Sequence, residues 1–428
     1  MYRAKLSSQE VAELVSARKR VAVERALQSA FLRDRLGKIN LDRLDEPEEW
    51  GRIPLLHKEE LRELSTQTFY SDFCIADPAT AVEFWRSGGA TGKPLFYPRS
   101  KADIAFAVDV AFRRLWPCIG ATATDTLHIS FPLGIHPVGQ LAARSAELEG
   151  IGTIWAGAGT TTPSRQQIQL IQELRPTILA AMPSYAIHLA NLANAEGIDM
   201  AESSVKKLLV SAEPLTSSKR EKLQRQWGAT VYNSFGLTEG GMAAAEHEPG
   251  AGMVAWNDLY FMEVVDKESG LPLAEGETGV LVITPLWSNT ITPFLRWVTG
   301  DLVSLCRQEP DANPWSIYPL LQHAHRTVGF FKIRGININH SDLEDFMFSR
   351  YEVADFKVEV ISSEGNDVLR LLVEPVSNAE PGRTTAVLIR EIKNKFELRP
   401  EIEITAPGQL ALDFEKHTKA PRFVDLRT

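Results

Sequence analysis

The sequence is poor in cysteine, with three in 428 residues. Cys74, Cys118 and Cys306 lie far apart and form no Cys-x-x-Cys pair. We therefore expect no disulfide framework, and a reducing compartment such as the cytoplasm fits this composition. The N-terminal residues also lack the apolar run of a secretory signal, and no stretch reaches the roughly 18 apolar residues of a membrane-spanning helix. The sequence thus predicts a cytoplasmic protein with no membrane partner.

An excess of positive charge is missing as well. Lysine and arginine together number 46 against 55 aspartate and glutamate residues, which gives a net charge of -9. Such a balance provides no general attraction to nucleic acid or to an anionic membrane surface. Hydrophobic residues make up 44% and charged residues 24%, which is ordinary for a globular protein and argues against disorder. The length predicts two or three domains.

Hydrophobic patterns divide the chain into two regions. Up to about residue 300, short apolar runs alternate with helical patterns, which is typical of a layered α/β domain. After Gly335 the pattern changes to a helix, two strands and a second helix. We therefore predict an α/β protein with a large N-terminal domain over residues 1–327 and a smaller, mobile α+β domain over residues 328–428. The expected strands lie at residues 126–130, 177–181, 207–210, 230–235, 358–361 and 369–373, and further helices at residues 57–64, 217–227 and 385–398.

Capping patterns mark three helix starts. A serine or threonine followed three residues later by Glu or Gln allows two reciprocal hydrogen bonds at a helix N-terminus. The first helix is expected to run from Ser7 to Gly37, because glycine is a stop signal. The capping pairs are Ser7 with Glu10, Ser164 with Gln167 for a helix that ends before Pro176, and Ser341 with Glu344 for a helix that ends at Phe348.

A glycine-rich loop follows the apolar pair Phe84-Trp85. Glycines allow backbone N–H groups to converge on an anion, and hydroxyl groups and a lysine add donors and positive charge. The spacing excludes a Walker A loop, because three residues rather than four separate Gly88 from Gly92, and Pro94 replaces the Ser or Thr that would hold Mg²⁺. A phosphate site and a flexible turn both remain open for the isolated loop. The loop reads Ser87-Gly88-Gly89-Ala90-Thr91-Gly92-Lys93-Pro94.

A second polar segment follows the apolar strand that begins at Thr230. The strand is expected to end in a turn at Gly236, beyond which Thr238 and Glu239 stand next to each other. A carboxylate is the ligand that Mg²⁺ takes alongside phosphate oxygens, and the threonine hydroxyl can donate to phosphate. Glu239 alone is also compatible with a solvated loop position.

Three later segments also contain charged side chains that suit a nucleotide site. Asp301 follows a Thr-Gly turn and can accept hydrogen bonds from ribose hydroxyls, although turns also favour aspartate for local reasons. Arg326, Lys332 and Gly335 lie in a basic segment that fits either a hinge in contact with a nucleotide or a solvated strand. Lys419 lies in the C-terminal tail, where a lysine is ordinarily a surface charge.

In this order and at these separations, the segments resemble the adenylate-forming superfamily of acyl-CoA synthetases and adenylation domains, and most of all its phenylacetate–CoA ligase branch. Residues 87–94 look like the phosphate loop of that family, and residues 233–239 look like its Asn-x-Tyr-Gly-x-Thr-Glu segment, with Phe235 in place of tyrosine. Residues 211–214 resemble a Gly-Ala-Glu-Pro segment, residues 182–185 a Thr-Pro-Ser-Tyr segment, and residues 53–62 a Leu-Pro…Lys-x-x-Leu-Arg segment.

The resemblance implies an ATP-dependent ligase of adenylate-forming fold. A carboxylic acid would react with ATP to give an acyl-adenylate and pyrophosphate, and CoA would then take the acyl group as a thioester with release of AMP. ATP, Mg²⁺ and CoA are the implied cofactors and cosubstrates, and a homodimer is consistent with the family. The usual hinge aspartate is missing from residues 325–329, so delivery of the acyl group to an acyl carrier protein or an amine remains an alternative.

The resemblance also implies a role for each matching residue. Lys419 would bridge the acid carboxylate and the α-phosphate, where a positive charge offsets the repulsion between two anions. The acid pocket has neutral and mostly small side chains, which suits a flat aromatic acid. The implied set comprises Lys419, Glu239 and Thr238 for catalysis; Glu239 and Thr91 for Mg²⁺; Ser87, Gly88, Gly89, Thr91, Gly92 and Lys93 for phosphate; Ala212, Glu213, Pro214, Asn233, Ser234, Phe235 and Gly236 for the adenine side; Asp301 and Arg326 for ribose; Lys332 and Gly335 for the nucleotide and the pantetheine channel; and His136, Tyr185, Ala212, Gly236 and Gly240 for the acid.

Many members of this branch also carry a Cys/His zinc site. The matching region of this sequence has His247, His323 and His325, but Val254 occupies another ligand position and few fourth ligands are available. Structural zinc is therefore not expected, and these histidines fit ordinary surface positions.

Overall fold

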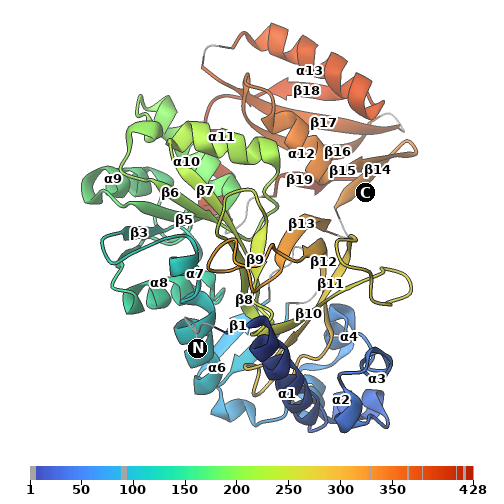
Figure 1. The fold of residues 1–428 in the computed structure, drawn as a ribbon. Helices are drawn as coiled ribbons and strands as arrows, with labels where there is room; N and C mark the ends of the chain where they lie inside the picture. Colours follow the sequence, from blue (N-terminus) through green and yellow to red (C-terminus); the bar gives the residue numbers. More distant parts are fainter. Residues whose placement is uncertain are drawn as a thin grey trace. The chain divides into compact units, whose positions relative to one another are not determined.

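The computed structural model describes residues 6–87, 94–326, 329–363, 366–377, 379–410, 412–417 and 421–427, and its elements are labelled in Figure 1. The chain forms two compact units. Unit 1 comprises Met1–Asp125, Pro132–Thr153 and Tyr232–Thr327, and unit 2 comprises Thr126–Phe131, Ile154–Val231 and Val328–Thr428. The chain passes from one unit to the other more than once. One of these passages lies between residues 327 and 328, where the sequence predicts a domain boundary. The division into a large domain of residues 1–327 and a mobile domain of residues 328–428 stays a prediction.

The N-terminal part of unit 1 is helical. The predicted capping box is confirmed, because Ser7 accepts a hydrogen bond from the N–H of Glu10 and the Glu10 carboxylate accepts one from the N–H of Ser7. The prediction of one helix up to Gly37 is wrong, because Ser29 starts a second helix by accepting from the N–H of Leu32. The helices here are α1 (Ser8–Ala26), α2 (Ala30–Leu36), α3 (Pro47–Gly51), α4 (Lys58–Glu63) and α5 (Thr66–Thr68).

An antiparallel sheet forms the core of unit 1. Its strands follow the order β10-β11-β12-β13-β9-β8-β7. Buried strand residues such as Leu281, Ile283 and Trp297 pack in one cluster with Val23 and Leu32 of the N-terminal helices. The strands are β7 (Thr230–Leu237), β8 (Gly241–Glu246), β9 (Met253–Ala255), β10 (Tyr260–Val265), β11 (Gly279–Pro285), β12 (Trp297–Cys306) and β13 (Leu320–Arg326), and the helices that follow α5 in this unit are α6 (Lys101–Phe106), α7 (Leu115–Cys118) and α8 (Val138–Leu148).

Unit 2 contains the parallel strands that the sequence predicts. β5 (Ile178–Ala181) pairs in parallel with β3 (Thr126–Ile129) on one side and with β6 (Lys207–Val210) on the other. All four residues of β5 are buried, and strands covered on both faces read as continuous apolar runs in a sequence. α9 (Ser164–Leu174) precedes β5, α10 (Pro183–Ala195) lies between β5 and β6, and α11 (Ser217–Trp227), which has the predicted bounds, follows β6. β4 (Gly152–Trp155) and β7 carry the chain across unit boundaries.

The C-terminal region of unit 2 is an α+β module, as the sequence predicts. Its sheet has the order β18-β17-β16-β19. β16 (Val353–Ser363) and β17 (Asn366–Pro375) pair antiparallel, and β18 (Glu401–Ile404) and β19 (Phe423–Asp425) join the two edges in parallel. The hairpin of β14 (Phe330–Ile333) and β15 (Ile336–Asn339) precedes α12 (His340–Phe348), and the later helices are α13 (Pro381–Phe396) and α14 (Leu412–Lys416).

Two predicted helix caps are wrong. α9 follows Pro163 and has no side-chain cap, while Gln167 lies in the interior and accepts a hydrogen bond from Ser130 at 2.6 Å. α12 is capped by Asn339, whose side chain accepts a hydrogen bond from the N–H of Ser341 at 2.8 Å. Buried hydrogen-bond partners and a better cap nearby outweigh the local sequence pattern.

Two predicted turns are also wrong. Gly236 lies within β7, and the Thr299-Gly300 pair lies within β12, so Asp301 sits in the middle of a strand rather than after a turn. Strand pairing explains why these glycines do not form turns. β7 pairs with β8, and β12 pairs with both β11 and β13, so each strand continues through its glycine.

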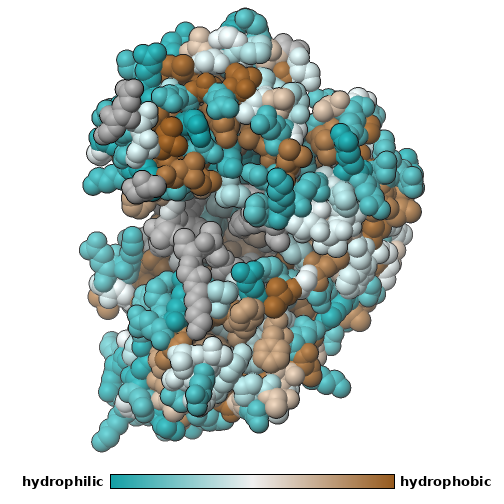
Figure 2. Space-filling model, turned by 180° about the vertical axis from the view of Figure 1, so that it is seen from behind, coloured by the Kyte–Doolittle hydropathy of each residue, from teal (hydrophilic) through white to brown (hydrophobic). Residues whose placement is uncertain are grey.

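The surface mixes both kinds of side chain. Figure 2 shows hydrophilic residues over much of one face, with smaller hydrophobic patches among them. Scattered apolar residues are normal on a folded surface. No helix in the part of the chain that the structure describes is long and apolar enough to cross a membrane.

Candidate active site

The base of the glycine-rich loop is fixed by a hairpin in unit 1. β1 (Glu83–Arg86) pairs antiparallel with β2 (Phe96–Arg99). Beyond the paired strands, the N–H of Ser87 donates to the carbonyl of Leu95 at 2.9 Å, and the N–H of Leu95 donates to the Ser87 hydroxyl at 3.2 Å. Both ends of the predicted phosphate loop are therefore held together. The predicted loop residues Gly88, Gly89, Thr91, Gly92 and Lys93 lie outside the described residues.

Glu239 lies in the same unit and is connected to this loop base. The hydroxyl of Tyr97 donates to Oε1 of Glu239 at 2.9 Å, and the Nζ of Lys58 lies 3.3 Å from the same oxygen. Burial, reinforced by the charge of Glu239, raises the pKa of Tyr97 well above its usual value, and a hydrogen bond from Ser87 opposes this shift. Tyr97 therefore keeps its proton and links Ser87 to Glu239.

A buried arginine holds the backbone that carries Thr238 and Glu239. Arg99 donates to the carbonyl of Thr238 at 2.7 Å and to that of Glu239 at 3.2 Å. The side-chain amide of Asn289 donates to the carbonyl of Glu239 at 2.7 Å, and Arg99 contacts Asn289 and Thr292 in turn. Because these groups are buried and partnered, the two adjacent residues have a fixed backbone position.

Gly236 and Gly240 are required by packing. A Cβ on Gly236 would come within 2.9 Å of the Gly241 carbonyl oxygen, and one on Gly240 would come within 3.1 Å of Ile283. A register shift between Phe235 and Gly236 lies at the same place. The absence of side chains thus allows β7 and β8 to approach closely beside Glu239.

The two predicted ribose residues lie opposite each other. Asp301 of β12 and Arg326 of β13 are partners in the strand register. Asp301 accepts from or pairs with Nε2 of His323 at 3.2 Å, and the ring of His323 is 6.3 Å from that of Phe235. The structure therefore brings Asp301 and Arg326 together and places the predicted adenine-side Phe235 near their strands. The neighbouring Asn233 donates its N–H to Glu246 at 2.8 Å, and Ser234 is buried.

The other predicted adenine-side segment lies in unit 2. Ala212 has a left-handed conformation with φ of 70°. The Glu213 carboxylate accepts from the N–H and the hydroxyl of Ser184 at 3.0 and 2.6 Å, at the N-terminus of α10. The Pro214 carbonyl accepts from Lys219 at 3.1 Å. This segment thus has an ordered local role, and its part in adenine binding stays a prediction.

Tyr185 lies in the interior of unit 2. Its side chain is 1% exposed, and its hydroxyl accepts from Gln167 at 2.9 Å and lies 3.0 Å from the hydroxyl of Ser164. Its ring also packs against Phe414, with 5.6 Å between centroids. Burial raises the pKa of Tyr185, so the hydroxyl stays protonated. Its predicted contact with the acid is untested.

His136 lies in the loop before α8. Its Nε2 atom is 3.5 Å from the guanidinium of Arg86, and the N–H of Arg86 donates to the carbonyl of Ile135 at 3.1 Å. Burial, followed by the charge of Arg86, lowers the pKa of His136, so the imidazole is neutral at pH 7. The predicted acid-site histidine therefore stands beside β1, near the loop base at Ser87.

Three remaining predicted residues lie towards the C-terminus. Gly335 forms the β14–β15 turn with φ of 84°, which suits glycine. Lys332 is exposed on β14, and its carbonyl accepts from Arg427 at 2.8 Å. Lys419 lies outside the described residues.

The structure adds functional candidates that the sequence did not single out. Lys58 falls in the segment that resembles Lys-x-x-Leu-Arg, but nothing in the sequence joins it to Glu239, 181 residues away. Tyr97 and Arg99 follow the loop as part of an ordinary strand pattern. All three contact Glu239 or its backbone.

The histidines considered for zinc have other contacts. Nδ1 of His247 lies 2.8 Å from the carbonyl of Cys118, and His323 pairs with Asp301. Among the residues that the structure describes, no group of three or more His, Cys, Asp or Glu side chains could hold a metal ion.

Comparison with known proteins shows the family. A family model described as AMP-binding enzyme matches residues 56–285, more than half of the chain. The chain is 31% identical over 334 residues to a phenylacetate–coenzyme A ligase of Thermus thermophilus, covering 76% of this chain and 72% of that protein. It is 28% identical over 352 residues to a phenylacetate–coenzyme A ligase of Aromatoleum evansii, covering 80% and 78%.

The fold is likewise shared with a solved structure. A 2-hydroxyisobutyryl-CoA ligase, crystallised in the postadenylation state with R3-HIB-AMP, matches with a TM-score of 0.83 at 24% identity, over 96% of this chain and 88% of that one. The predicted α/β fold of adenylate-forming type is confirmed. Together with the sequence matches, this establishes that the chain belongs to the AMP-binding enzyme family, in which it is similar to the phenylacetate–CoA ligases.

Proposed function

We propose that this chain is an AMP-forming acid–CoA ligase that acts on an aromatic carboxylic acid. In the first step the acid carboxylate attacks the α-phosphate of ATP and pyrophosphate leaves. In the second step the thiol of CoA attacks the acyl carbon and AMP leaves. The observation that carries the proposal is the buried contact chain from Ser87 through Tyr97 to Glu239, in a member of the AMP-binding enzyme family.

Glu239 suits the role of Mg²⁺ ligand. Tyr97 and Lys58 both contact Oε1, so Oε2 is the oxygen left for a metal among the contacts of the described residues. Mg²⁺ in nucleotide sites commonly takes one or two carboxylates and completes its shell with phosphate oxygens and water, so a single carboxylate suffices. When bound, the ion would offset the charge of the β- and γ-phosphates. Lys58 holds Oε1 of Glu239, the carboxylate oxygen that does not face the proposed metal.

The remaining residues have roles that follow from their chemistry. Asp301 accepts hydrogen bonds from the ribose hydroxyls, beside Arg326 on the neighbouring strand. The backbone of the loop that starts at Ser87, with Lys93, binds the β- and γ-phosphates. Lys419 places its charge between the attacking carboxylate and the α-phosphate, which lowers the repulsion between two anions in the transition state. The domains of residues 1–327 and 328–428 would then reorient for the second step, in which Lys332 and Gly335 face the pantetheine arm.

An aromatic acid is supported by the uncharged side chain of His136 and by the relatives. The lowered pKa of His136 makes it an uncharged neighbour for the acid. The relatives in Thermus thermophilus and Aromatoleum evansii are named for phenylacetate, an aryl-substituted acid. We therefore expect arylacetic acids to be better substrates than amino acids or charged acids.

The test is product analysis. The purified chain is incubated with ATP, Mg²⁺, CoA and a panel of arylacetic, benzoic, alicyclic and short aliphatic acids, and AMP, pyrophosphate and the CoA thioester are quantified. We expect one AMP and one thioester per acid consumed, with arylacetic acids fastest. ADP as the nucleotide product, or AMP release without any thioester, would contradict the proposal.

One observation favours a different acceptor. Residues 325–329 lack the aspartate usual in the family hinge, so the acyl group could pass to an acyl carrier protein or an amine. Pyrophosphate exchange that proceeds while CoA leaves turnover unchanged would support this second candidate. Steady turnover with CoA alone would exclude it. A homodimer is a separate proposal, which light scattering of the purified chain tests.

A further inference from the structure

The loop before α8 carries His136, and its backbone is held by the side chain of Gln140. The Nε2 group of Gln140 donates to the carbonyl of Leu133 and, at 3.0 Å, to that of Gly134. Packing gives this part of the loop little support, because Ile135 is 47% exposed and a Cβ on Gly134 would meet no atom within 4 Å outside its chain neighbours. The direction in which the loop presents His136 therefore depends on its hydrogen bonds.

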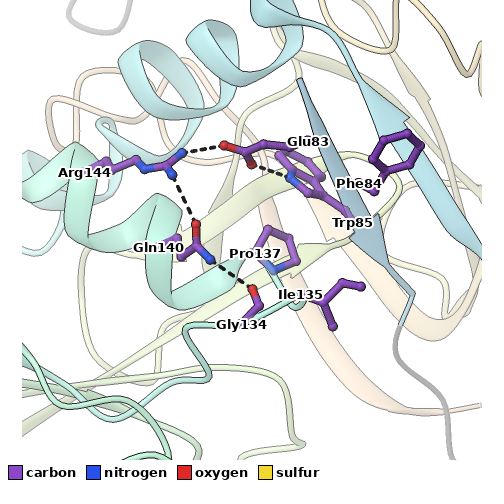
Figure 3. Close-up of a pocket in the computed structure, with 8 residues that line it drawn as sticks. All are labelled: Glu83, Phe84, Trp85, Gly134, Ile135, Pro137, Gln140 and Arg144. Carbon is purple, nitrogen blue, oxygen red and sulfur yellow. Dashed lines mark hydrogen bonds and ion pairs between the residues drawn. The ribbon is translucent and has the colours of Figure 1, made fainter. Parts of the chain in front are cut away.

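Gln140 is itself held by Arg144 and Glu83. Arg144 lies one turn later on α8 and donates to Oε1 of Gln140 at 3.1 Å and to Oε1 of Glu83 on β1 at 2.7 Å. Figure 3 shows this chain of contacts, which continues from Gln140 to Gly134. We call Glu83, Gln140 and Arg144 the loop clamp. The clamp lines a cavity of about 350 Å³, so its contacts cross a space that packing does not fill.

The strand that carries Glu83 also contacts the nucleotide side of the proposed site. The second carboxylate oxygen of Glu83 accepts from the indole N–H of Trp85 at 2.9 Å. The guanidinium of Arg99 lies 4.7 Å from the centre of the Trp85 ring, and Arg99 holds the backbone that carries Glu239. The loop clamp therefore starts on the same hairpin that fixes the proposed Mg²⁺ ligand.

We propose that Glu83, Gln140 and Arg144 are positioning residues that hold His136 in its place beside the acid. They act through the loop, because Gln140 binds the carbonyl groups of two residues that come shortly before His136 in the chain. Without the clamp, the loop can move away from Arg86, whose guanidinium lies 3.5 Å from His136. The inference rests on the proposed function, in which His136 is a neighbour of the acid.

The experiment compares Gln140→Met, His136→Ala, the double variant of both and the control Gln9→Met. Methionine keeps the length of the glutamine side chain but has no N–H donor. Gln9 lies on α1 in the same unit and donates to Glu13 one turn later at 2.9 Å, so it matches the contact of Gln140 with Arg144. Acid-dependent pyrophosphate exchange is measured at varied acid and varied ATP, with the acid that the wild type uses fastest in the product panel.

The expected kinetic result is selective for the acid. Gln140→Met raises the KM for the acid by about tenfold, as for loss of two or three hydrogen bonds, while the KM for ATP stays at the wild-type value. His136→Ala raises the KM for the acid at least as much. Adding Gln140→Met to His136→Ala raises it no further, because the clamp acts through this histidine. Gln9→Met changes neither KM.

A second measurement reads the loop directly. Burial, followed by the charge of Arg86, lowers the pKa of His136. In Gln140→Met the pKa of His136 should return towards its usual value of 6.5, because the loop no longer holds the imidazole beside Arg86. The titration is followed by NMR of histidine-labelled protein, in which the missing signal of His136→Ala assigns the resonance. Gln9→Met should titrate as the wild type does.

Several outcomes overturn the inference. If Gln140→Met leaves the KM for the acid unchanged, or raises the KM for ATP equally, the clamp has only a structural role. A further loss in the double variant beyond that of His136→Ala shows that the clamp acts on another group. An unchanged pKa of His136 in Gln140→Met shows that the clamp does not hold the loop. A wild type without acid-dependent pyrophosphate exchange refutes the proposed function instead, and the titration then still decides whether the clamp holds the loop.

Discussion

Tyr97→Phe tests the contact that joins the loop base to Glu239. The change removes one hydroxyl that lies 2.9 Å from Glu239 Oε1 and takes a hydrogen bond from Ser87. The ring is kept, and with it the packing against Phe69 and Phe294 at centroid distances of 6.3 and 5.2 Å. Glu239 therefore loses one of its two contacts at Oε1, while the core around it is unchanged.

The size of the effect follows from the type of hydrogen bond. A buried hydrogen bond to a charged group contributes about 1.5–3 kcal/mol. If that free energy is needed to hold Glu239 in its productive position, kcat/KM for ATP in the adenylation step should fall by about 10- to 100-fold. The Mg²⁺ concentration for half-maximal activity should rise in parallel, because Glu239 is the proposed ligand.

The assay is acid-dependent pyrophosphate exchange at varied ATP and Mg²⁺. Tyr70→Phe is the matched control, since Tyr70 also packs on Phe69, at 5.5 Å, but no hydrogen bond of its hydroxyl is found among the described residues. Thioester formation from a supplied acyl-adenylate should be unaffected by Tyr97→Phe. Unchanged exchange kinetics, or an equal loss from the supplied adenylate, would refute the reasoning.

Three further predictions concern other parts of the chain. Lys419→Ala should lower pyrophosphate exchange by about 10²–10³-fold while thioester formation from a supplied acyl-adenylate changes far less; equal losses would remove the proposed role. Gly236→Ala places a Cβ 2.9 Å from the Gly241 carbonyl oxygen and should lower the thermal midpoint, unlike Gly51→Ala, where the Cβ enters open space. Burial lowers the pKa of Lys222 from 10.5 to about 8, opposed by Asp355 and reinforced by Arg225 and Arg422. The native state thus loses this proton at lower pH than the unfolded chain, so stability should rise between pH 8 and 10.5. Lys222→Met should lack this rise in urea midpoints, and an equal rise in both proteins would contradict it.

Local sequence patterns predicted those elements whose cause is local. The Ser7–Glu10 capping box forms because both partners lie on the same helix turn. β5 was predicted because a strand buried on both faces needs apolar residues throughout. α11 has the predicted bounds, and the structure shows local signals at both ends: Thr216 caps its start, and Gly228 ends it in a left-handed conformation.

Contacts between distant residues could not be predicted in this way. Lys58 and Glu239 are 181 residues apart, and Arg99 and Asn289 are 190 apart. Lys58 comes from α4, Arg99 from β2 and Asn289 from the connection between β11 and β12. These elements pack around the turn after β7 that carries Glu239, and no local sequence pattern predicts that packing. The ordered motifs thus predicted Glu239 as a site residue, while the groups that hold it became visible only in three dimensions.

Buried charges in unit 2 illustrate the same limit. Lys219 pairs with Glu344 at 2.7 Å, and Arg422 pairs with Glu344 at 3.3 Å and with Asp355 at 2.5 Å. From the sequence, Glu344 is expected only as a capping partner of Ser341, and nothing in the sequence joins it to Lys219 or Arg422. Removing charges from water costs several kcal/mol per ion unless partners compensate it, so each of these side chains is tolerated only because the others are present. These ion pairs join α11, α12 and β16 within unit 2.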